Sequence, residues 1–115
     1  MGVAQVYAVL PVDDIDSAST WYERLFGRPA DLAPMDGLLE WQVTPGGALQ
    51  VVRDQDRSGQ GMLTLGVDDI DEHTAALADR GVEVGEIVDT SVGFRISTLL
   101  DPAGNTLTLA EEALD

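Results

Sequence analysis

Cysteine and histidine, two side-chain types that often act as nucleophiles, bases or transition-metal ligands, are scarce in this sequence of 115 residues. There is no cysteine, so thiolate nucleophiles, disulfides and cysteine metal sites are excluded. The one histidine, His73, lies in a segment with helical spacing, where we expect a solvated helix residue. Neither a G-x-S-x-G nucleophile motif nor a glycine-rich phosphate loop occurs. No catalytic residue is therefore predicted.

Glu40 and Trp41 are neighbours in a segment, 38–44, that is expected to form a strand. Because side chains alternate between the two faces of a strand, only one of the two can point into a cavity. Trp41 would offer a planar ligand a stacking surface, and core packing is its alternative role. Glu40 would offer a carboxylate to a cation or act as a base. The sequence leaves the choice open.

Arg95 lies inside another expected strand, where its charge needs a partner. An anionic ligand or an internal carboxylate would each serve, so Arg95 joins Glu40 as a candidate charged anchor. Of the two partners we favour the internal carboxylate.

An internal repeat predicts how these residues are positioned. The run VDDID occurs at 12–16 and again at 67–71, each time after an apolar stretch and before a helix-like segment. The tripeptides PGG at 45–47 and PAG at 102–104 form a second pair, each ahead of a short apolar strand. Repetition of this kind predicts two copies of one structural unit, which must pack together because neither half is long enough to bury its own core.

We expect the two copies to be pseudo-symmetric modules of one α+β domain, 1–115, with the element order βαβββ–βαβββ. The modules span about 3–53 and 61–111, and a polar segment at about 54–60 links them. Two curved units that face each other would enclose a cavity, whose lining decides the function.

The expected helices run from Asp13 or Asp14 to Phe26, and from Asp69 to about Arg80. A glycine follows each of them and can end it. The expected strands are 5–12, 29–33, 38–44, 48–53, 62–67, 82–89, 94–100 and 105–110.

The formal net charge is −15, and every positively charged side chain is an arginine. A field of this sign repels nucleic acid and anionic membranes and would concentrate cationic ligands. Solubility is the simpler explanation, since the acidic residues are spread along the whole chain. No apolar segment approaches the roughly 20 residues that cross a bilayer, so a cytoplasmic protein is expected.

Three segments resemble the vicinal oxygen chelate superfamily, which includes glyoxalase I, extradiol dioxygenases and bleomycin-resistance proteins. They are LPVDDIDSASTWYERLFG at 10–27, LGVDDIDEHTAALADRGVEV at 65–84 and GFRISTLLDPAGNTLTL at 93–109. The likeness covers nearly the whole chain and implies a glyoxalase/bleomycin-resistance-like fold, a curved mixed sheet around a cavity. It implies little about function, because this fold carries many activities.

The resemblance also locates four positions that hold metal ligands, usually histidine or glutamate, in metal-dependent members of the superfamily. They fall on Tyr7, Gln50, Met62 and Thr108. Phenol, amide, thioether and hydroxyl groups do not make a site for zinc, iron or nickel, which bind imidazole, thiolate or carboxylate. We therefore expect no metal and no other cofactor.

Strand alternation around these positions predicts the lining of the cavity. The predicted ligand-binding residues are Tyr7, Val9, Trp41, Gln50, Met62, Thr64 and Thr108. Apolar walls with a few hydrogen-bonding groups suit a medium-sized organic ligand. The alternative is that these side chains simply fill the space as core.

Three functions remain. The first is a metal-free binding protein of the glyoxalase/bleomycin-resistance type, which sequesters a planar or cationic organic molecule such as an antibiotic. The second is an enzyme of the superfamily, a lyase, an isomerase or a dioxygenase relative, that works without the usual metal. The third is a structural or regulatory module with a filled cavity.

We favour the binding protein. The resemblance implies a homodimer, and we expect a small organic ligand but neither nucleic acid nor membrane as a partner. The identity of the ligand, the dimer geometry, and whether modules pair within or between chains stay open.

Overall fold

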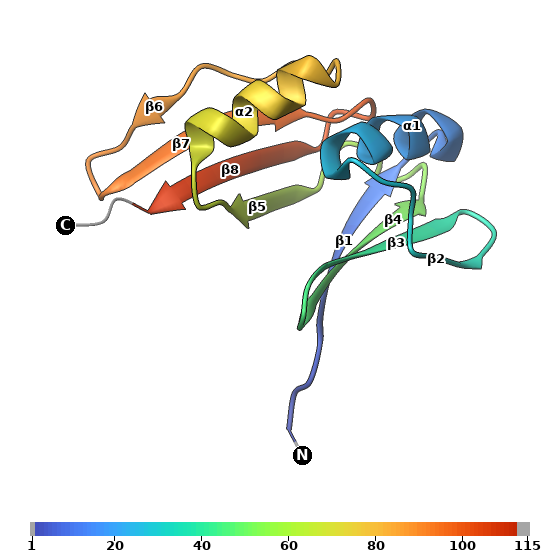
Figure 1. The fold of residues 1–115 in the computed structure, drawn as a ribbon. Helices are drawn as coiled ribbons and strands as arrows, with labels where there is room; N and C mark the ends of the chain where they lie inside the picture. The colour runs from blue at the N-terminus through green and yellow to red at the C-terminus, as the bar shows by residue number, and fades with distance from the viewer. Residues whose placement is uncertain (1, 113–115) are drawn as a thin grey trace.

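The computed structural model describes residues 2–112 and contains two copies of one βαβββ module (Figure 1). The N-terminal module comprises β1 (Val6–Val12), α1 (Ile15–Phe26), β2 (Leu32–Met35), β3 (Leu38–Thr44) and β4 (Gly47–Arg53). The C-terminal module comprises β5 (Met62–Gly66), α2 (Ile70–Asp79), β6 (Val88–Asp89), β7 (Phe94–Leu100) and β8 (Thr106–Glu112). The expected α+β class and the repeated element order are confirmed.

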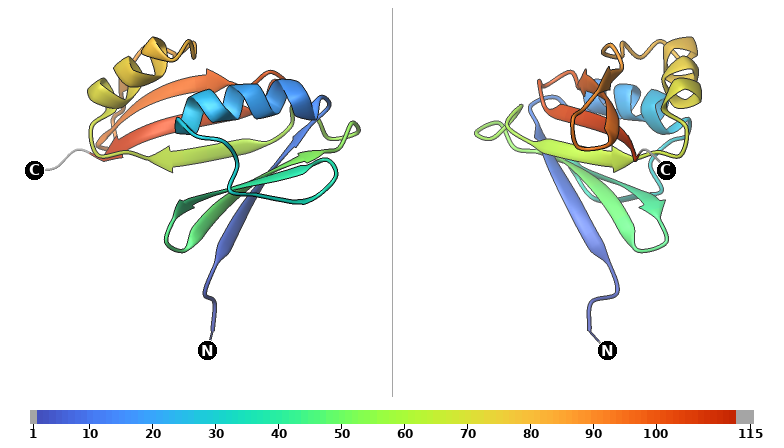
Figure 2. Two further views of the ribbon diagram at one scale, coloured as in Figure 1. Left: turned by 45° about the vertical axis from the view of Figure 1, so that its right-hand side comes forward. Right: turned by 90° about the vertical axis from the view of Figure 1, so that its left-hand side faces the viewer.

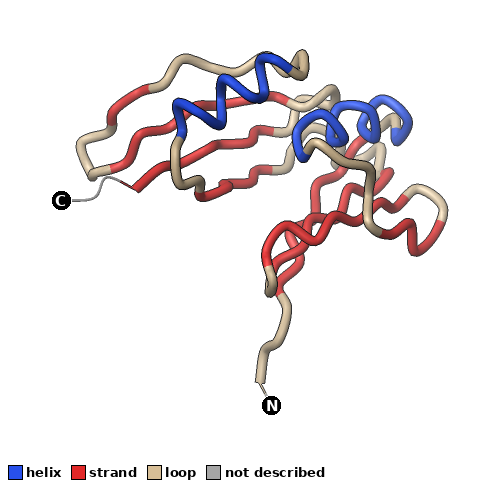
Figure 3. The backbone as a smooth tube through the Cα atoms, in the orientation of Figure 1, coloured by secondary structure: helices blue, strands red, loops and turns tan. Residues whose placement is uncertain are grey.

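Each module forms its own four-stranded mixed sheet, in the orders β1-β4-β3-β2 and β5-β8-β7-β6. The first strand of a module runs parallel to the last, and the other neighbours are antiparallel. Figures 2 and 3 show the two sheets diverging, each with its helix on one side. The other side of each sheet carries no helix and is called its helix-free face below.

Both helices begin at the repeated aspartate that the sequence predicts. The carboxylate of Asp14 accepts hydrogen bonds from the backbone N–H groups of Asp16 and Ser17, and the carboxylate of Asp69 accepts one from Glu72. These bonds satisfy donors that the first helical turn leaves free. α1 ends at Gly27, whose φ of 72° is the left-handed conformation that favours glycine. Neither of these two helices is both long enough and apolar enough to span a bilayer.

The helix-covered sides of both sheets pack into one hydrophobic core. Its fully buried members come from both modules and include Leu10, Tyr22, Trp41, Leu49, Ile70, Leu77, Leu107 and Leu109. Because one core contains side chains from both modules, each module buries its apolar surface partly against the other.

A buried hydrogen-bond cluster of Tyr22, Asp101 and Asn105, called the inter-module clasp below, joins the two halves. The Tyr22 hydroxyl donates to Oδ2 of Asp101 over 2.7 Å. Nδ2 of Asn105 donates to the same oxygen over 2.8 Å and to the carbonyl of Pro11 over 2.7 Å. Oδ1 of Asn105 accepts the backbone N–H of Gly61. The clasp thus ties α1 and β1 to the turn between β7 and β8.

Two expected strands differ from the observed ones by more than two residues at one end, and the others differ by two residues or fewer. β2 begins at Leu32 and not at 29, because a side chain takes over the pairing there: the Asp31 carboxylate binds Arg28 and the backbone N–H of Gln42. The strand expected at 82–89 shrinks to β6.

The reason for the shorter strand is a close approach of Gly85 to β7. Its N–H donates to the carbonyl of Thr98 over 3.0 Å, and its own carbonyl accepts the Ser97 hydroxyl over 2.7 Å. A Cβ at Gly85 would lie 2.5 Å from the Thr98 oxygen, so only glycine fits without a shift. These two hydrogen bonds of Gly85 take the place of regular strand pairing between residues 82–87 and β7.

Candidate functional site

The helix-free face of the N-terminal sheet brings Tyr7, Val9, Glu40 and Gln50 together. The strand register places Val9 on β1 beside Gln50 on β4, and Gln50 beside Glu40 on β3. Nε2 of Gln50 donates a hydrogen bond of 2.9 Å to Oε1 of Glu40, whose exposed fraction is only 8%. Tyr7 and Val9 are 51% and 52% exposed. This face is an open, partly apolar surface with a nearly buried carboxylate on its central strands.

Trp41 lies on the opposite, helix-covered side of β3 and is fully buried. Its ring centroid is 5.8 Å from that of Tyr22 and 5.7 Å from that of Phe26, both on α1. Its Nε1 donates to the carbonyl of Arg28 over 3.0 Å. Of the two arrangements that the sequence left open, the structure has Glu40 on the helix-free face. The prediction of Trp41 as a ligand-binding residue is therefore wrong, because α1 takes it into the core.

The helix-free face of the C-terminal sheet carries Met62, Thr64 and Thr108. The register pairs Thr64 on β5 with Thr108 on β8, and Thr108 with Thr98 on β7. Met62, at the start of β5, is 81% exposed. A row of hydroxyl groups therefore crosses this face beside an uncovered thioether.

One chain leaves both helix-free faces open. The sheets diverge from the region where β1 and β5 approach each other, so neither face covers the other (Figures 1 and 2). Apart from Arg95, the sequence predicted no ligand-binding residue on β2 or β7, although both strands contribute large exposed apolar side chains: Leu32, Met35, Phe94 and Leu100. The alternation along β7 was the signal that could have identified its two members.

The four positions that the resemblance aligns with metal ligands lie on these faces, Tyr7 and Gln50 on one and Met62 and Thr108 on the other. Their donor groups do not fit a zinc, iron or nickel ion. Within residues 2–112, no group of three or more histidine, cysteine, aspartate or glutamate side chains is placed to hold a metal. The residues present thus do not fit the metal of the superfamily.

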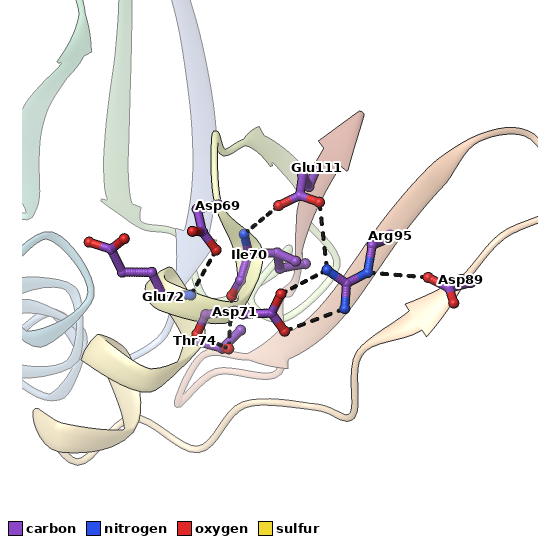
Figure 4. A network of polar contacts seen from close by, with 8 residues as sticks. All are labelled: Asp69, Ile70, Asp71, Glu72, Thr74, Asp89, Arg95 and Glu111. Atoms are coloured by element: carbon purple, nitrogen blue, oxygen red, sulfur yellow. Dashed lines mark hydrogen bonds and ion pairs between the residues drawn. The ribbon is translucent and has the colours of Figure 1, made fainter. Parts of the chain in front are cut away.

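Arg95 lies on the helix-covered side of β7, where it pairs with three carboxylates (Figure 4). Its Nη1 is 2.8 Å from Oδ2 of Asp71 and 3.6 Å from Oε1 of Glu111, and its Nε is 3.2 Å from Oδ1 of Asp89. Oε2 of Glu111 accepts the backbone N–H of Ile70 over 2.8 Å. The expected internal salt bridge is confirmed, and Arg95 holds the start of α2 against its sheet.

Replacing Arg95 by methionine is expected to lower the melting temperature and to flatten its dependence on acid. The hydrogen bond from Arg95 lowers the pKa of Asp71 from its ordinary value of 3.8. A lowered pKa in the folded state contributes stability that is present above the ordinary pKa and is lost as the pH falls below about 4. Thermal unfolding from pH 6 to pH 2 measures both effects.

The matched control is Arg57→Met, because the side chain of Arg57 is 79% exposed and pairs only loosely with Asp54 at 3.6 Å. It should follow the wild-type curve. If Arg95→Met follows that curve as well, the Arg95 network does not stabilise the protein.

Comparisons with known proteins agree with this geometry. A sequence model of the glyoxalase-like domain matches residues 7–110. The chain is similar to a glyoxalase / bleomycin resistance protein from Catenulispora acidiphila DSM 44928, with 31% identity, a TM-score of 0.86, and coverage of 93% of this chain and 96% of the other.

Two further solved structures share the fold. TnmS3, an antibiotic binding protein from Streptomyces sp. CB03234, is 25% identical with a TM-score of 0.80, over 98% of this chain and 99% of its own. A bleomycin-binding protein complexed with bleomycin is 22% identical with a TM-score of 0.78, over 94% of this chain and 98% of its own. No curated protein matches the sequence significantly.

Proposed function

The chain belongs to the glyoxalase-like domain family, and from that premise we propose that it binds a small cationic organic molecule, without a metal ion, in a cavity closed by two copies of the chain. The observation that carries this proposal is the pair of open helix-free faces. They expose large apolar side chains to water, with Glu40 almost buried among those of the N-terminal face.

The open faces support a homodimer. Scattered exposed apolar residues are ordinary, but a contiguous patch of them indicates an interaction surface. Tyr7, Val9, Leu32 and Met35 share the N-terminal face, and Met62, Phe94 and Leu100 share the C-terminal one. A second copy that lays its C-terminal face opposite the N-terminal face of the first would cover both and leave two equivalent cavities.

Glu40 supports a cationic ligand. Its carboxylate accepts a hydrogen bond from the neutral Gln50 amide, and within residues 2–112 no arginine pairs with it. A nearly buried charge with a neutral partner attracts a cation strongly, and the net charge of −15 favours the same sign of ligand. Tyr7 and Val9 would contact the apolar part of the molecule. TnmS3 and the bleomycin-binding protein, which bind antibiotics, are relatives in fold and suggest this class of ligand.

The proposal is tested with a panel of cationic glycopeptides and planar cationic antibiotics, bleomycin among them. We expect one of them to raise the melting temperature of the protein and to bind in calorimetry without added metal. The variant Glu40→Gln should bind it roughly 10- to 100-fold more weakly, because a charge-assisted contact is replaced by a neutral one.

The matched control is Glu23→Gln, which removes the same charge from the exposed side of α1. It should bind like the wild type.

Sedimentation should give a dimer that Met62→Asp converts to a monomer. A monomeric wild-type protein with no response to the panel would contradict the proposal, and so would binding that requires zinc, iron or nickel.

A further inference from the structure

We propose that the chain carries a second ligand site, a cleft of about 450 Å³ at the junction of the two modules, which binds a small organic acid or phosphate ester with an apolar body. This junction cleft lies between the C-terminal end of α1, the end of β3, the edge strand β5 and α2, and Arg28, His73 and Arg80 line it. Its basic side chains and most of its apolar lining come from the ends of α1 and α2 and from the helix-covered side of the sheets, so the site differs from the one proposed on the helix-free faces; Thr64 is the residue that the cleft shares with the C-terminal helix-free face.

The charge of the junction cleft is opposite to that of the chain. The sequence has 21 acidic residues against 6 arginines and one histidine. Two of those arginines and the histidine line the cleft, and among residues 2–112 no acidic residue does. A concave site with walls of low dielectric focuses the field of its own charges, so an anion is favoured here although the protein as a whole repels it.

Arg80 is held in place without being neutralised. Its Nε and Nη2 donate to the backbone carbonyls of Arg24 and Leu25 at the end of α1. These partners carry only partial charges, and within residues 2–112 no carboxylate forms an ion pair with Arg80. Among the residues that the structure describes, Nη1 of Arg80 donates no hydrogen bond, so both of its N–H groups can serve a ligand. The result is a rigid guanidinium with free donors, which suits a carboxylate or phosphate.

Arg28 adds a second, partly compensated charge. Its Nη1 is 2.6 Å from Oδ1 of Asp31, and its Nη2 donates to the carbonyl of Gln42 over 2.7 Å. Both bonds fix the guanidinium at the mouth of the cleft, and Nε makes no hydrogen bond within residues 2–112. Arg28 therefore adds a donor in a fixed position.

His73 is the third polar group of the cleft. We expected it to be a solvated helix residue, but the structure has it partly buried on α2. Burial, and after it the charge of Arg80, lowers its pKa. Asp68, Asp69 and Glu72 share a neighbouring hollow with His73 and would act in the opposite direction. Because burial and the charge of Arg80 both disfavour the protonated ring, an anion bound beside His73 would favour that form and raise the pKa of His73.

The other walls of the cleft fit the body of such a ligand. Leu25, Phe26 and Val43 form an apolar side, and the hydroxyls of Thr44 and Thr64 lie at its rim. The volume is in the range of sites for small organic molecules. An aromatic or aliphatic acid can thus place its apolar part against Phe26 and its charged group toward Arg80.

The single histidine provides the test, because the protein gives one set of imidazole proton signals in NMR spectra. The probes are benzoate and phenyl phosphate, with benzamide as the neutral match and sodium chloride at equal ionic strength. We expect both anions to saturate and to raise the pKa of His73 by roughly one pH unit, which corresponds to tenfold tighter binding to the protonated form. An equal shift with benzamide or with chloride would overturn the proposal.

Variants test the assignment of residues. Arg80→Gln should weaken benzoate binding at least tenfold in calorimetry. Should that variant fail to fold, His73→Asp replaces it, since His73 makes no hydrogen bond through its ring within residues 2–112 and its replacement leaves α2 intact. A carboxylate beside Arg80 should abolish binding and leave the melting temperature unchanged or higher.

The matched control for loss of positive charge is Arg57→Gln in the exposed link between the modules, which should bind benzoate like the wild type. Wild-type affinity in the folded His73→Asp variant would overturn the proposal. Tighter binding of phenyl phosphate than of benzoate would favour a phosphate ester as the class of ligand, and the reverse order would favour a carboxylate. Either order supports an anion site.

Discussion

The variant Asp101→Ala is expected to lose about 3–5 kcal/mol of unfolding free energy, measured by chemical denaturation. The carboxylate of Asp101 accepts hydrogen bonds from the Tyr22 hydroxyl and from the side-chain amide of Asn105. It also accepts the backbone N–H groups of Ala103 and Asn105, each over 2.9 Å. Alanine would leave these buried donors without an acceptor, and an unsatisfied buried polar group is costly. The hydrogen bond that links α1 to the turn between β7 and β8 would also be lost.

Two controls separate this effect from general destabilisation. Tyr22→Phe removes one donor and leaves the other three, so a loss of about 1–2 kcal/mol is expected. Asp79→Ala, at an exposed position near the end of α2, should change the free energy of unfolding by less than about 0.5 kcal/mol. If Asp101→Ala resembles Asp79→Ala, the inter-module clasp does not hold the modules together.

The clasp also predicts sensitivity to alkali. Burial, and after it the charge of Asp101, raises the pKa of Tyr22. A raised pKa in the folded state contributes stability that is complete below the ordinary tyrosine pKa and is lost as the pH rises above about 10. The wild type should therefore lose stability above that pH more steeply than Tyr22→Phe.

The variant Trp41→Ala is expected to lose about 3–5 kcal/mol as well, because a large, fully buried ring is removed. The cavity that remains would lie between Tyr22 and Phe26, and the carbonyl of Arg28 would lose its donor. In contrast, Trp21→Ala removes a partly exposed ring and should cost less. Equal losses would mean that Trp41 is not a core residue.

Fluorescence distinguishes the two tryptophans. In Trp21→Phe, Trp41 is the remaining fluorophore, and acrylamide should quench it poorly because water does not reach the ring. Efficient quenching would mean that Trp41 is exposed on a helix-free face, which is the alternative that the sequence left open.

The sequence predicted the fold well because the repeat carries local chemistry. Asp14 and Asp69 are the third residue of each VDDID run, and each caps the helix that follows it. The apolar spacing that follows then determines which helix face is buried. Such signals come from residues only a few positions apart, so they can be recognised in the sequence without knowledge of the tertiary structure.

Local sequence signals could not decide whether Glu40 or Trp41 lies on the helix-free face. Alternation shows that the two point to opposite sides of β3, but it does not show which side a helix covers. That depends on Tyr22 and Phe26, which reach Trp41 from another element. Open faces pose the same problem, because an apolar residue such as Val9 has the same pattern whether it meets core or water.

Contacts between distant residues were missed for a related reason. Tyr22 and Asp101 are 79 positions apart, and no local pattern links them. The junction cleft likewise combines Arg28 and Arg80, one from each module. Arginine is visibly scarce in the sequence, but only the tertiary structure, in which Arg80 donates hydrogen bonds to backbone carbonyls at the end of α1, brings the two arginines to one cleft.

The alternation of these strands has a consequence for how such proteins diversify. Leu107 and Leu109 lie in the shared core, whereas Thr108 between them faces outward; Val9 and Leu10 differ in the same way. Inward and outward positions of one strand can thus be substituted independently. A change at an outward residue such as Thr108 alters the surface that the sheet presents, while the inward leucines continue to specify the same fold.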